Sequence, residues 1–370
     1  MPDKKNDLST HYRKAFSEAS ELFVVVAYLT EWDKTLPQLP ARSKFRLIVG
    51  KDFGITRKNA CQDVLDWLPA KRSYQFMVAD HIEGFHPKAA VWKTHDNRHF
   101  AIVGSSNLTR AAFSSNFEAN VYTEISAEIY QEARNWLNEI EKKAVIVSED
   151  WLKKYREAPR SSNGKRPAKS NTDGTKPVIN IKLPLPKGTM KIIQTRRDQL
   201  EIHKKYKKKL VHHFRRCADG EITSKEFYSQ LPDYWGYNIG NRLQGPGFER
   251  QGRSSDFSSL SRAFIRVLNT SPCDRDDVVI EEIDRLADEK VSSRKAFFTE
   301  MLCLSYPEEY PILNSPVQKY LEKIEFRAPR GASEGVKYVD LAKKLRLALL
   351  STKNFPAKNI AELDAVIWHN

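Results

Sequence analysis

Several features that mark membrane, secreted or metal-binding proteins are missing from this sequence. It has no run of 18 or more apolar residues, which excludes a membrane-spanning helix of ordinary length. Its first ten residues are polar and lack the apolar core of a secretion signal. Its cysteines form no CxxC pair, so neither a zinc site nor a disulfide framework is indicated; they are Cys61, Cys217, Cys273 and Cys303. We therefore expect a reduced, cytoplasmic protein without a membrane segment.

Acidic residues are scarce in one part of the chain, and positive charge accumulates there. The net charge is +14, yet residues 151–216 alone hold 20 lysines and arginines against 4 acidic residues. The excess in this segment is larger than the net charge of the whole chain. Such a concentration attracts polyanions, first nucleic acid and then anionic membrane. A solvated, flexible basic linker is the alternative interpretation.

The spacing of apolar residues changes near residue 150. Before it, short β-rich runs alternate with helical spacing, and the helix at 127–144 is expected to bury Ile129, Ala133, Trp136, Ile140 and Ala144. The runs lie at 22–29, 45–50, 73–79, 85–92, 100–104 and 116–123, and the other helices at 57–68 and 108–113. Alternation of this kind predicts an α/β sandwich, a mixed sheet flanked by helices, over residues 1–150.

The remainder of the chain reads as a linker followed by helices. Residues 151–190 are rich in proline, serine, lysine and arginine, which predicts a basic linker. Residues 191–370 predict a mainly α-helical domain for DNA recognition or partner binding. Helical spacing recurs there at 196–217, 257–268, 277–289, 294–304, 316–324, 338–351 and 360–368.

One short region gathers residues that suit cleavage of a phosphodiester. His86 and Lys88 lie two apart on an expected strand, so their side chains share a face. The next strand ends at Gly104-Ser105-Ser106-Asn107, where glycine permits a tight turn and a following helix would direct N–H groups towards an anion. A third strand brings Glu118.

Each residue of this set has a chemical role and a plainer alternative. Imidazole can attack phosphorus, Lys88 and Asn107 can hold phosphoryl oxygens, and Glu118 can orient the imidazole. Taken alone, Ser105 and Asn107 would be turn or cap residues. The role of Glu118 could be shared by Asn116 or Asn120, which are expected on the same face. The complete set, in this order, favours catalysis.

His86-Pro87-Lys88 and Gly104-Ser105-Ser106-Asn107 resemble the signature of the phospholipase D superfamily, His-x-Lys followed by Gly-Ser-x-Asn. Residues 20–145 are similar to its single-motif nucleases, the BfiI-type metal-independent restriction endonucleases, which add a glutamate at the spacing of Glu118. Lys93 stands where many members have aspartate, and this departure favours the nuclease branch over the lipases. A second His-x-Lys, at residues 203–205, has no Gly-Ser-x-Asn after it and is interpreted as a solvated basic face.

The resemblance implies a metal-independent endonuclease that hydrolyses DNA through a covalent phosphohistidine, and the expected substrate is double-stranded. The superfamily chemistry uses two His-x-Lys motifs, so we expect a homodimer with one composite site. Neither a cofactor nor a metal is implied. The setting expected by analogy is restriction or phage defence, with a companion subunit as one option. The alternatives are a phospholipase-type lipid phosphodiesterase and a catalytically silent nucleic-acid-binding protein.

The second half carries the candidate nucleic-acid-binding residues. They are Arg196, Arg197, Lys204, Lys205, Lys208 and Lys209 in the expected helix, and Arg242, Arg250 and Arg253 in a glycine-rich stretch. Cations in such numbers suit phosphate contacts, and the neighbouring Tyr234, Trp235 and Tyr237 could stack on bases. The alternative is that the aromatics are core residues and the arginines are solvated.

Overall fold

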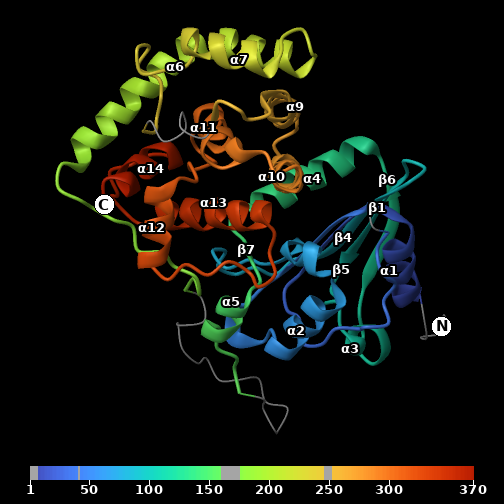
Figure 1. Cartoon of the computed structure of the whole chain (residues 1–370). Helices are drawn as coiled ribbons and strands as arrows, with labels where there is room; N and C mark the ends of the chain where they lie inside the picture. The colour runs from blue at the N-terminus through green and yellow to red at the C-terminus, as the bar shows by residue number, and fades with distance from the viewer. Residues whose placement is uncertain (1–6, 41, 160–175, 246–251) are drawn as a thin grey trace. The chain divides into compact units, whose positions relative to one another are not determined.

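The computed structural model describes residues 7–40, 42–159, 176–245 and 252–370 of the chain. Its internal contacts divide the chain into two units (Figure 1). The first comprises Met1–Ile179 with Pro329–Ala332, and the second comprises Asn180–Ala328 with Ser333–Asn370. The division falls inside the predicted linker at 151–190, and the first residues of that linker belong to a helix, α5 (Glu149–Lys154).

The first unit is built on one seven-stranded sheet with the order β6-β5-β4-β1-β2-β3-β7. Strands β1, β2 and β3 are parallel, whereas β4, β5, β6 and β7 are antiparallel to their neighbours. The strands are β1 Ala19–Val26, β2 Lys44–Val49, β3 Phe76–Val78, β4 Lys88–Thr94, β5 His99–Gly104, β6 Asn120–Ile125 and β7 Val145–Ile146. The predicted mixed sheet flanked by helices is confirmed.

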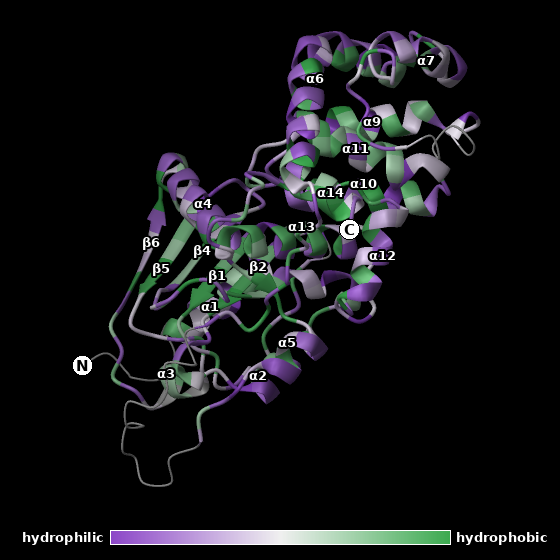
Figure 2. Cartoon of the chain, turned by 90° about the vertical axis from the view of Figure 1, so that its left-hand side faces the viewer, coloured by the Kyte–Doolittle hydropathy of each residue, from purple (hydrophilic) through white to green (hydrophobic). Residues whose placement is uncertain are grey.

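Helices cover the two faces of this sheet because the strand residues alternate between them. On one face, α4 (Ala127–Glu141) packs Tyr130 and Leu137 into a cluster with Phe23 of β1. Elsewhere in the unit, Phe16 of α1 (Asp7–Glu18) meets Phe45 of β2 and Trp67 of α2 (Lys58–Trp67) at ring-centroid distances of 5.8 and 5.7 Å. Figure 2 shows the hydrophobic colouring of β1 and β2 between these layers.

The buried stripe of α4 agrees with the predicted one only in part: Ile140 and Ala144 are buried as predicted. Ile129 and Trp136 are 52% and 46% exposed, while Tyr130 and Leu137 are buried. The guanidinium carbon of Arg134 lies 3.9 Å from the centroid of the Phe23 ring, so this arginine also covers the sheet. A long cationic side chain can cover apolar surface with its methylene groups, so a stripe read from apolar residues alone omits Arg134.

Several strands begin later than predicted, which places the motif residues in the segments that lead into them. Strand β4 starts at Lys88 because Pro87 has no N–H to donate to a neighbouring strand. Strand β6 starts at Asn120, opposite Gly104, where β5 ends. The run at 73–79 becomes a 3-10 helix, η2 (Ala70–Gln75), followed by β3, and the helix expected at 108–113 is α3 (Arg110–Ser114).

The second unit is mainly helical over its described residues, as predicted. Its helices are α6 Thr189–Ala218, α7 Ser224–Gln230, α9 Phe257–Leu268, α10 Arg275–Asp288, α11 Ala296–Ser305, α12 Ser315–Lys323, α13 Glu334–Ser351 and α14 Ile360–Trp368. Helix α7 was not expected, and it begins with a capping box between Thr223 and Glu226. None of the helices in the described ranges combines the length and the apolar character needed to cross a membrane.

Candidate active site

At one end of the first unit's sheet, strands β1 and β5 terminate and strands β4 and β6 begin. Because β4 is antiparallel to β1, Lys88 pairs with Val26 at the carboxyl end of β1. Likewise, Gly104 at the end of β5 pairs with Asn120 at the start of β6. The register therefore brings the residues before β4 and β6 beside those that follow β1 and β5.

His86 and Lys88 lie together at this end of the sheet. The Lys88 Nζ is 3.0 Å from Nδ1 and 3.4 Å from Nε2 of the His86 ring, and it donates to the His86 carbonyl at 3.2 Å. His86 is exposed and Lys88 is half-buried. The Tyr28 ring meets the imidazole edge-on, with centroids 5.6 Å apart, and so limits its rotation on one side. An imidazole and an ammonium group are thus presented to the same point in solvent.

Glu118 bonds to the neighbouring polar residues and not to the imidazole. The Ser105 hydroxyl donates to Glu118 Oε2, and the Asn116 amide donates to Oε1 at 3.1 Å. The N–H of Ala119 donates to the Ser105 hydroxyl at 3.0 Å, which ties this pair to the entry of β6. Among the described contacts of one chain, His86 is not a partner of Glu118. Asn116 therefore supports this carboxylate and does not replace it.

Charge at the site is balanced between Lys88 and Glu118. Partial burial lowers the pKa of the Lys88 ammonium, and the Glu118 carboxylate opposes this effect. The carboxylate is therefore close enough to be felt by the ammonium although the two make no direct ion pair among the described contacts. A phosphate arriving here meets a cation that the protein has not already neutralised by a salt bridge.

Asn107 is held by the backbone that follows β1. Its Oδ1 accepts a hydrogen bond from the N–H of Tyr28 at 3.2 Å. Within the described residues its NH₂ group makes no hydrogen bond, which leaves a donor for a phosphoryl oxygen. The structure therefore brings Asn107 to the same end of the sheet as His86 and Lys88.

The turn after β5 differs in detail from the prediction. Glycine is needed at position 104 because the backbone of Ala119 passes close to it: a Cβ there would lie 2.3 Å from the Ala119 carbonyl oxygen. The φ of Gly104 is not positive, so the turn itself does not require glycine. The following helix α3 has only five residues. Its N-cap Thr109 already accepts from the N–H of Ala112 at 3.3 Å, so that amide is not available to an anion.

Asp52 is a site-shaping residue that the sequence interpretation missed. It lies just beyond β2, is 2% exposed, and its Oδ2 accepts from the N–H of Gly84 at 2.8 Å and of Phe85 at 3.3 Å. These bonds hold the two residues that precede His86. A carboxylate at the carboxyl end of a buried strand was the available signal, but nothing in the sequence joined it to residue 86.

The two arginines at the start of the candidate nucleic-acid-binding set are engaged within the second unit. Arg196 is 3% exposed and bonds Asp364 at 3.1 Å and the carbonyl of Ala361 at 3.0 Å. The prediction that it contacts phosphate is wrong for this reason, because a buried arginine matched to a buried acid is a core pair. Arg197 is partly exposed and pairs with Glu362 at 2.8 Å.

The lysines of α6 lie on its solvent face. Exposed positions recur at helical spacing and include Lys204, Lys205, Lys208 and Lys209. His203, interpreted as part of that face, is instead 3% exposed, and burial lowers its pKa to about 4. The helix thus separates a basic face from a buried one.

The glycine-rich stretch contributes one buried and one exposed arginine. Arg242 is 5% exposed, with its guanidinium carbon 4.9 Å from the Trp235 ring centroid and 4.5 Å from that of Tyr237. Arg253 is exposed, and Arg250 lies outside the described residues. The contact between arginine and aromatic rings expected here is therefore made inside the protein.

Comparison with known proteins finds similarity for the first unit. Residues 13–141 match the family model for the PLD-like domain of cardiolipin synthase. The solved structure of NucT from Helicobacter pylori is similar at 16% identity, covering 40% of this chain and 95% of that chain, with a TM-score of 0.31. No curated protein matches the chain. The matched residues 13–141 hold the whole motif set, so the similarity to the PLD-like domain covers the candidate site.

Proposed function

We propose that this protein is a metal-independent endonuclease that hydrolyses DNA through a phosphohistidine. One observation carries the proposal: five polar residues gather at one end of the sheet. The Lys88 Nζ lies 3.0 Å from Nδ1 of His86, and Asn107 and the Ser105–Glu118 pair lie at the same end. Such a set supplies a nucleophile and donors for the phosphoryl oxygens from side chains alone.

The reaction proceeds in two displacements. The imidazole of one His86 attacks phosphorus, the bond to the leaving oxygen breaks, and a second imidazolium gives that oxygen its proton. That second imidazole then takes a proton from water, the resulting hydroxide attacks phosphorus, and the P–N bond breaks. Lys88 and the NH₂ of Asn107 hold the non-bridging oxygens throughout. Both histidines return to their starting protonation states.

The second imidazole comes from another copy of the chain in this proposal. A twofold axis beside the site supplies a second His86 and Lys88 by symmetry. The first unit offers an apolar surface for it: Val103 of β5 and Val121 of β6 pair with each other and are 54% and 64% exposed. Phe117, just before Glu118, is 88% exposed. β6 is an edge strand, so its outer side is available to a partner.

A mixed dimer tests the composite site. Co-expression of two differently tagged chains, one wild type and one His86→Ala, yields a dimer with a single imidazole. We expect this mixed dimer to be inactive, because one displacement partner is missing. Half of the wild-type activity in the purified mixed dimer would show that each chain works alone and would contradict the composite site.

DNA is the proposed substrate because of the second unit's charge. The exposed lysines of α6, Lys204, Lys205, Lys208 and Lys209, form a basic face that suits a phosphate backbone. Double-stranded DNA, a role in restriction or phage defence, a companion subunit and a cytoplasmic location complete the proposal by analogy.

Phospholipid is a second candidate substrate, since the matching family model is that of a cardiolipin synthase domain. Wild type, His86→Ala and His95→Ala should be offered supercoiled plasmid and, separately, vesicles of phosphatidylglycerol and cardiolipin. His95 is a matched control, because it is exposed at the opposite end of β4. We expect plasmid cleavage by wild type and His95→Ala only, with no lipid turnover. Lipid turnover without plasmid cleavage would replace the nuclease by a lipid enzyme, and plasmid binding without any turnover would indicate a silent binding protein.

A further inference from the structure

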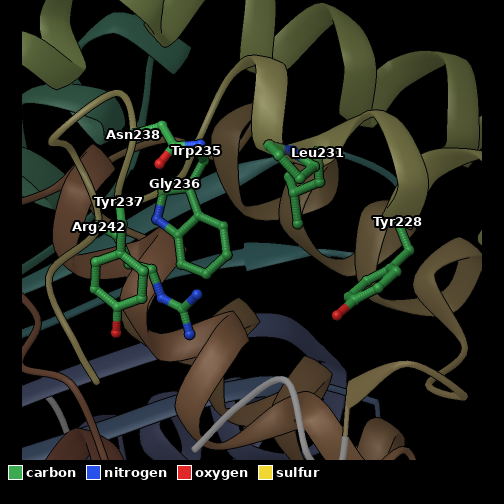
Figure 3. Close-up of a pocket in the computed structure, with 8 residues that line it drawn as sticks. Tyr228, Leu231, Trp235, Gly236, Tyr237, Asn238 and Arg242 are labelled. Carbon is green, nitrogen blue, oxygen red and sulfur yellow. The ribbon is translucent and has the colours of Figure 1, made fainter. Parts of the chain in front are cut away.

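The second unit contains a pocket with aromatic walls, and none of its lining residues belongs to the phosphodiesterase site. Its volume is about 200 Å³, and Tyr228, Trp235, Tyr237 and Arg242 lie around it. Figure 3 shows the Trp235 ring and the Arg242 guanidinium on one side, with the Tyr228 hydroxyl directed towards them from the other. The volume is below the roughly 300–1,000 Å³ of sites for drug-sized ligands, so it suits a single small ring system.

The loop that forms one wall is fixed by hydrogen bonds. Asn241 is fully buried, accepts from the N–H of Gly236 at 3.0 Å and donates to the carbonyl of Tyr234 at 2.9 Å. The Tyr237 hydroxyl donates to the carbonyl of Gln244 at 2.9 Å. These bonds close the loop on itself, so the aromatic rings are positioned before any ligand arrives.

A buried carboxyl group anchors the same wall from behind. Glu300 is 0% exposed, and its Oε1 accepts from Trp235 Nε1 at 3.1 Å and from the N–H of Leu243 at 2.6 Å. Trp235 is thereby held in one orientation, with the Arg242 guanidinium over its ring.

We propose that this pocket holds one base of a DNA strand after the base has left the stack. Aromatic faces stack on any base, and the pocket lining offers two aromatic rings that are not buried, those of Tyr228 and Tyr237. The backbone of that strand would follow the lysine face of α6, which belongs to the same unit. The inference rests on the proposed function only in taking DNA as the ligand.

The test uses the His86→Ala protein, which is expected to bind without cutting. Its affinity is measured for three short duplexes: fully paired, with one unpaired nucleotide, and with an abasic site in place of that nucleotide. Each of the four bases is tried in turn, and binding is followed by fluorescence anisotropy at low salt. The abasic duplex keeps the extra sugar and phosphate and lacks only the base. The difference in affinity between the duplex with the unpaired nucleotide and the abasic duplex therefore measures the contribution of the base.

Three further variants in the same background assign the effect to the pocket. Tyr228→Leu removes a ring, and Tyr228→Phe keeps it. Leu350→Ala changes a side chain that is 74% exposed and is not part of the pocket lining. We expect at least one unpaired base to bind about 5- to 150-fold more tightly than the abasic duplex, the range for stacking of one base on an aromatic ring. Tyr228→Leu should abolish this ratio, while Tyr228→Phe and Leu350→Ala should preserve it.

The outcomes separate this inference from the proposed function. Equal affinity for the unpaired and abasic duplexes would refute base binding in the pocket and would leave the proposed DNA nuclease activity untouched. The same holds if Tyr228→Leu is folded and keeps the full ratio. Absence of binding to all three duplexes would overturn both, because DNA would then not be the ligand.

Discussion

Removal of the Asp52 carboxylate should disable the site without touching a reacting group. Asp52→Ala leaves the N–H groups of Gly84 and Phe85 without their acceptor. Hydrogen bonds to a charged group contribute about 1.5–3 kcal/mol each. Gly84 is exposed and can bond to water, whereas Phe85 is 5% exposed and cannot, so we expect a decrease of about 3 kcal/mol in unfolding free energy.

The effect on catalysis should be similar in size to the effect on folding. The freed segment ends at His86, and a misplacement of about 1 Å at a reacting group can lower the rate on the order of 100-fold. Asp52→Asn is the matched variant, because its side-chain oxygen can still accept from both N–H groups. We expect it to retain most of the activity and to be destabilised by only about 1–2 kcal/mol, the difference between charged and neutral bonds.

The assay is the initial rate of plasmid cleavage over a range of DNA concentrations, below the melting temperature of each variant. A positioning role predicts a fall in kcat with little change in KM, since the lysine face proposed to bind DNA belongs to the other unit and is unaltered. If Asp52→Ala is folded and cuts with the wild-type kcat, the bonds to Gly84 and Phe85 do not position His86, and the reasoning fails.

Four further outcomes follow from the geometry. Burial raises the pKa of Glu300 to about 7, so wild-type stability should fall as pH rises from about 4.5 through 7, by up to about 3 kcal/mol; urea unfolding of Glu300→Gln should show no such fall. Replacing Lys204 and Lys208 by glutamine should reduce the slope of log affinity against log salt by roughly 1 for each phosphate that the variant no longer neutralises. Val121→Asp should give a monomer in sedimentation and no cleavage, while a dimeric, active Val121→Asp would exclude this face. Gly104→Ala should lower the melting temperature and the rate together, because its Cβ would lie 2.3 Å from a backbone oxygen.

The sequence was sufficient for the fold of the first unit and for the position of its motif, because both depend on local order. Strand alternation and the spacing of His86, Lys88 and Asn107 are properties of short segments. Asp52 and Tyr28 were missed because they meet the motif only through the sheet register, which the sequence does not display.

The sequence also could not predict which charged side chains are buried. Arg196 and Lys204 look alike in a basic helix, yet one meets Asp364, 168 residues away, and the other faces solvent. Which cation is buried depends on where a distant acid lies in the packed unit. The stripe of α4 was misjudged for a related reason, since Arg134 packs on Phe23 as a hydrophobic residue would.

Cleavage of supercoiled plasmid in excess EDTA, by wild type and His86→Ala in parallel, tests the central claim most directly. If His86 is the nucleophile of a metal-free reaction, wild type should nick or linearise the plasmid and His86→Ala should leave it intact. Equal cutting by both proteins, or cutting by wild type that appears only when a divalent metal is restored, would contradict it.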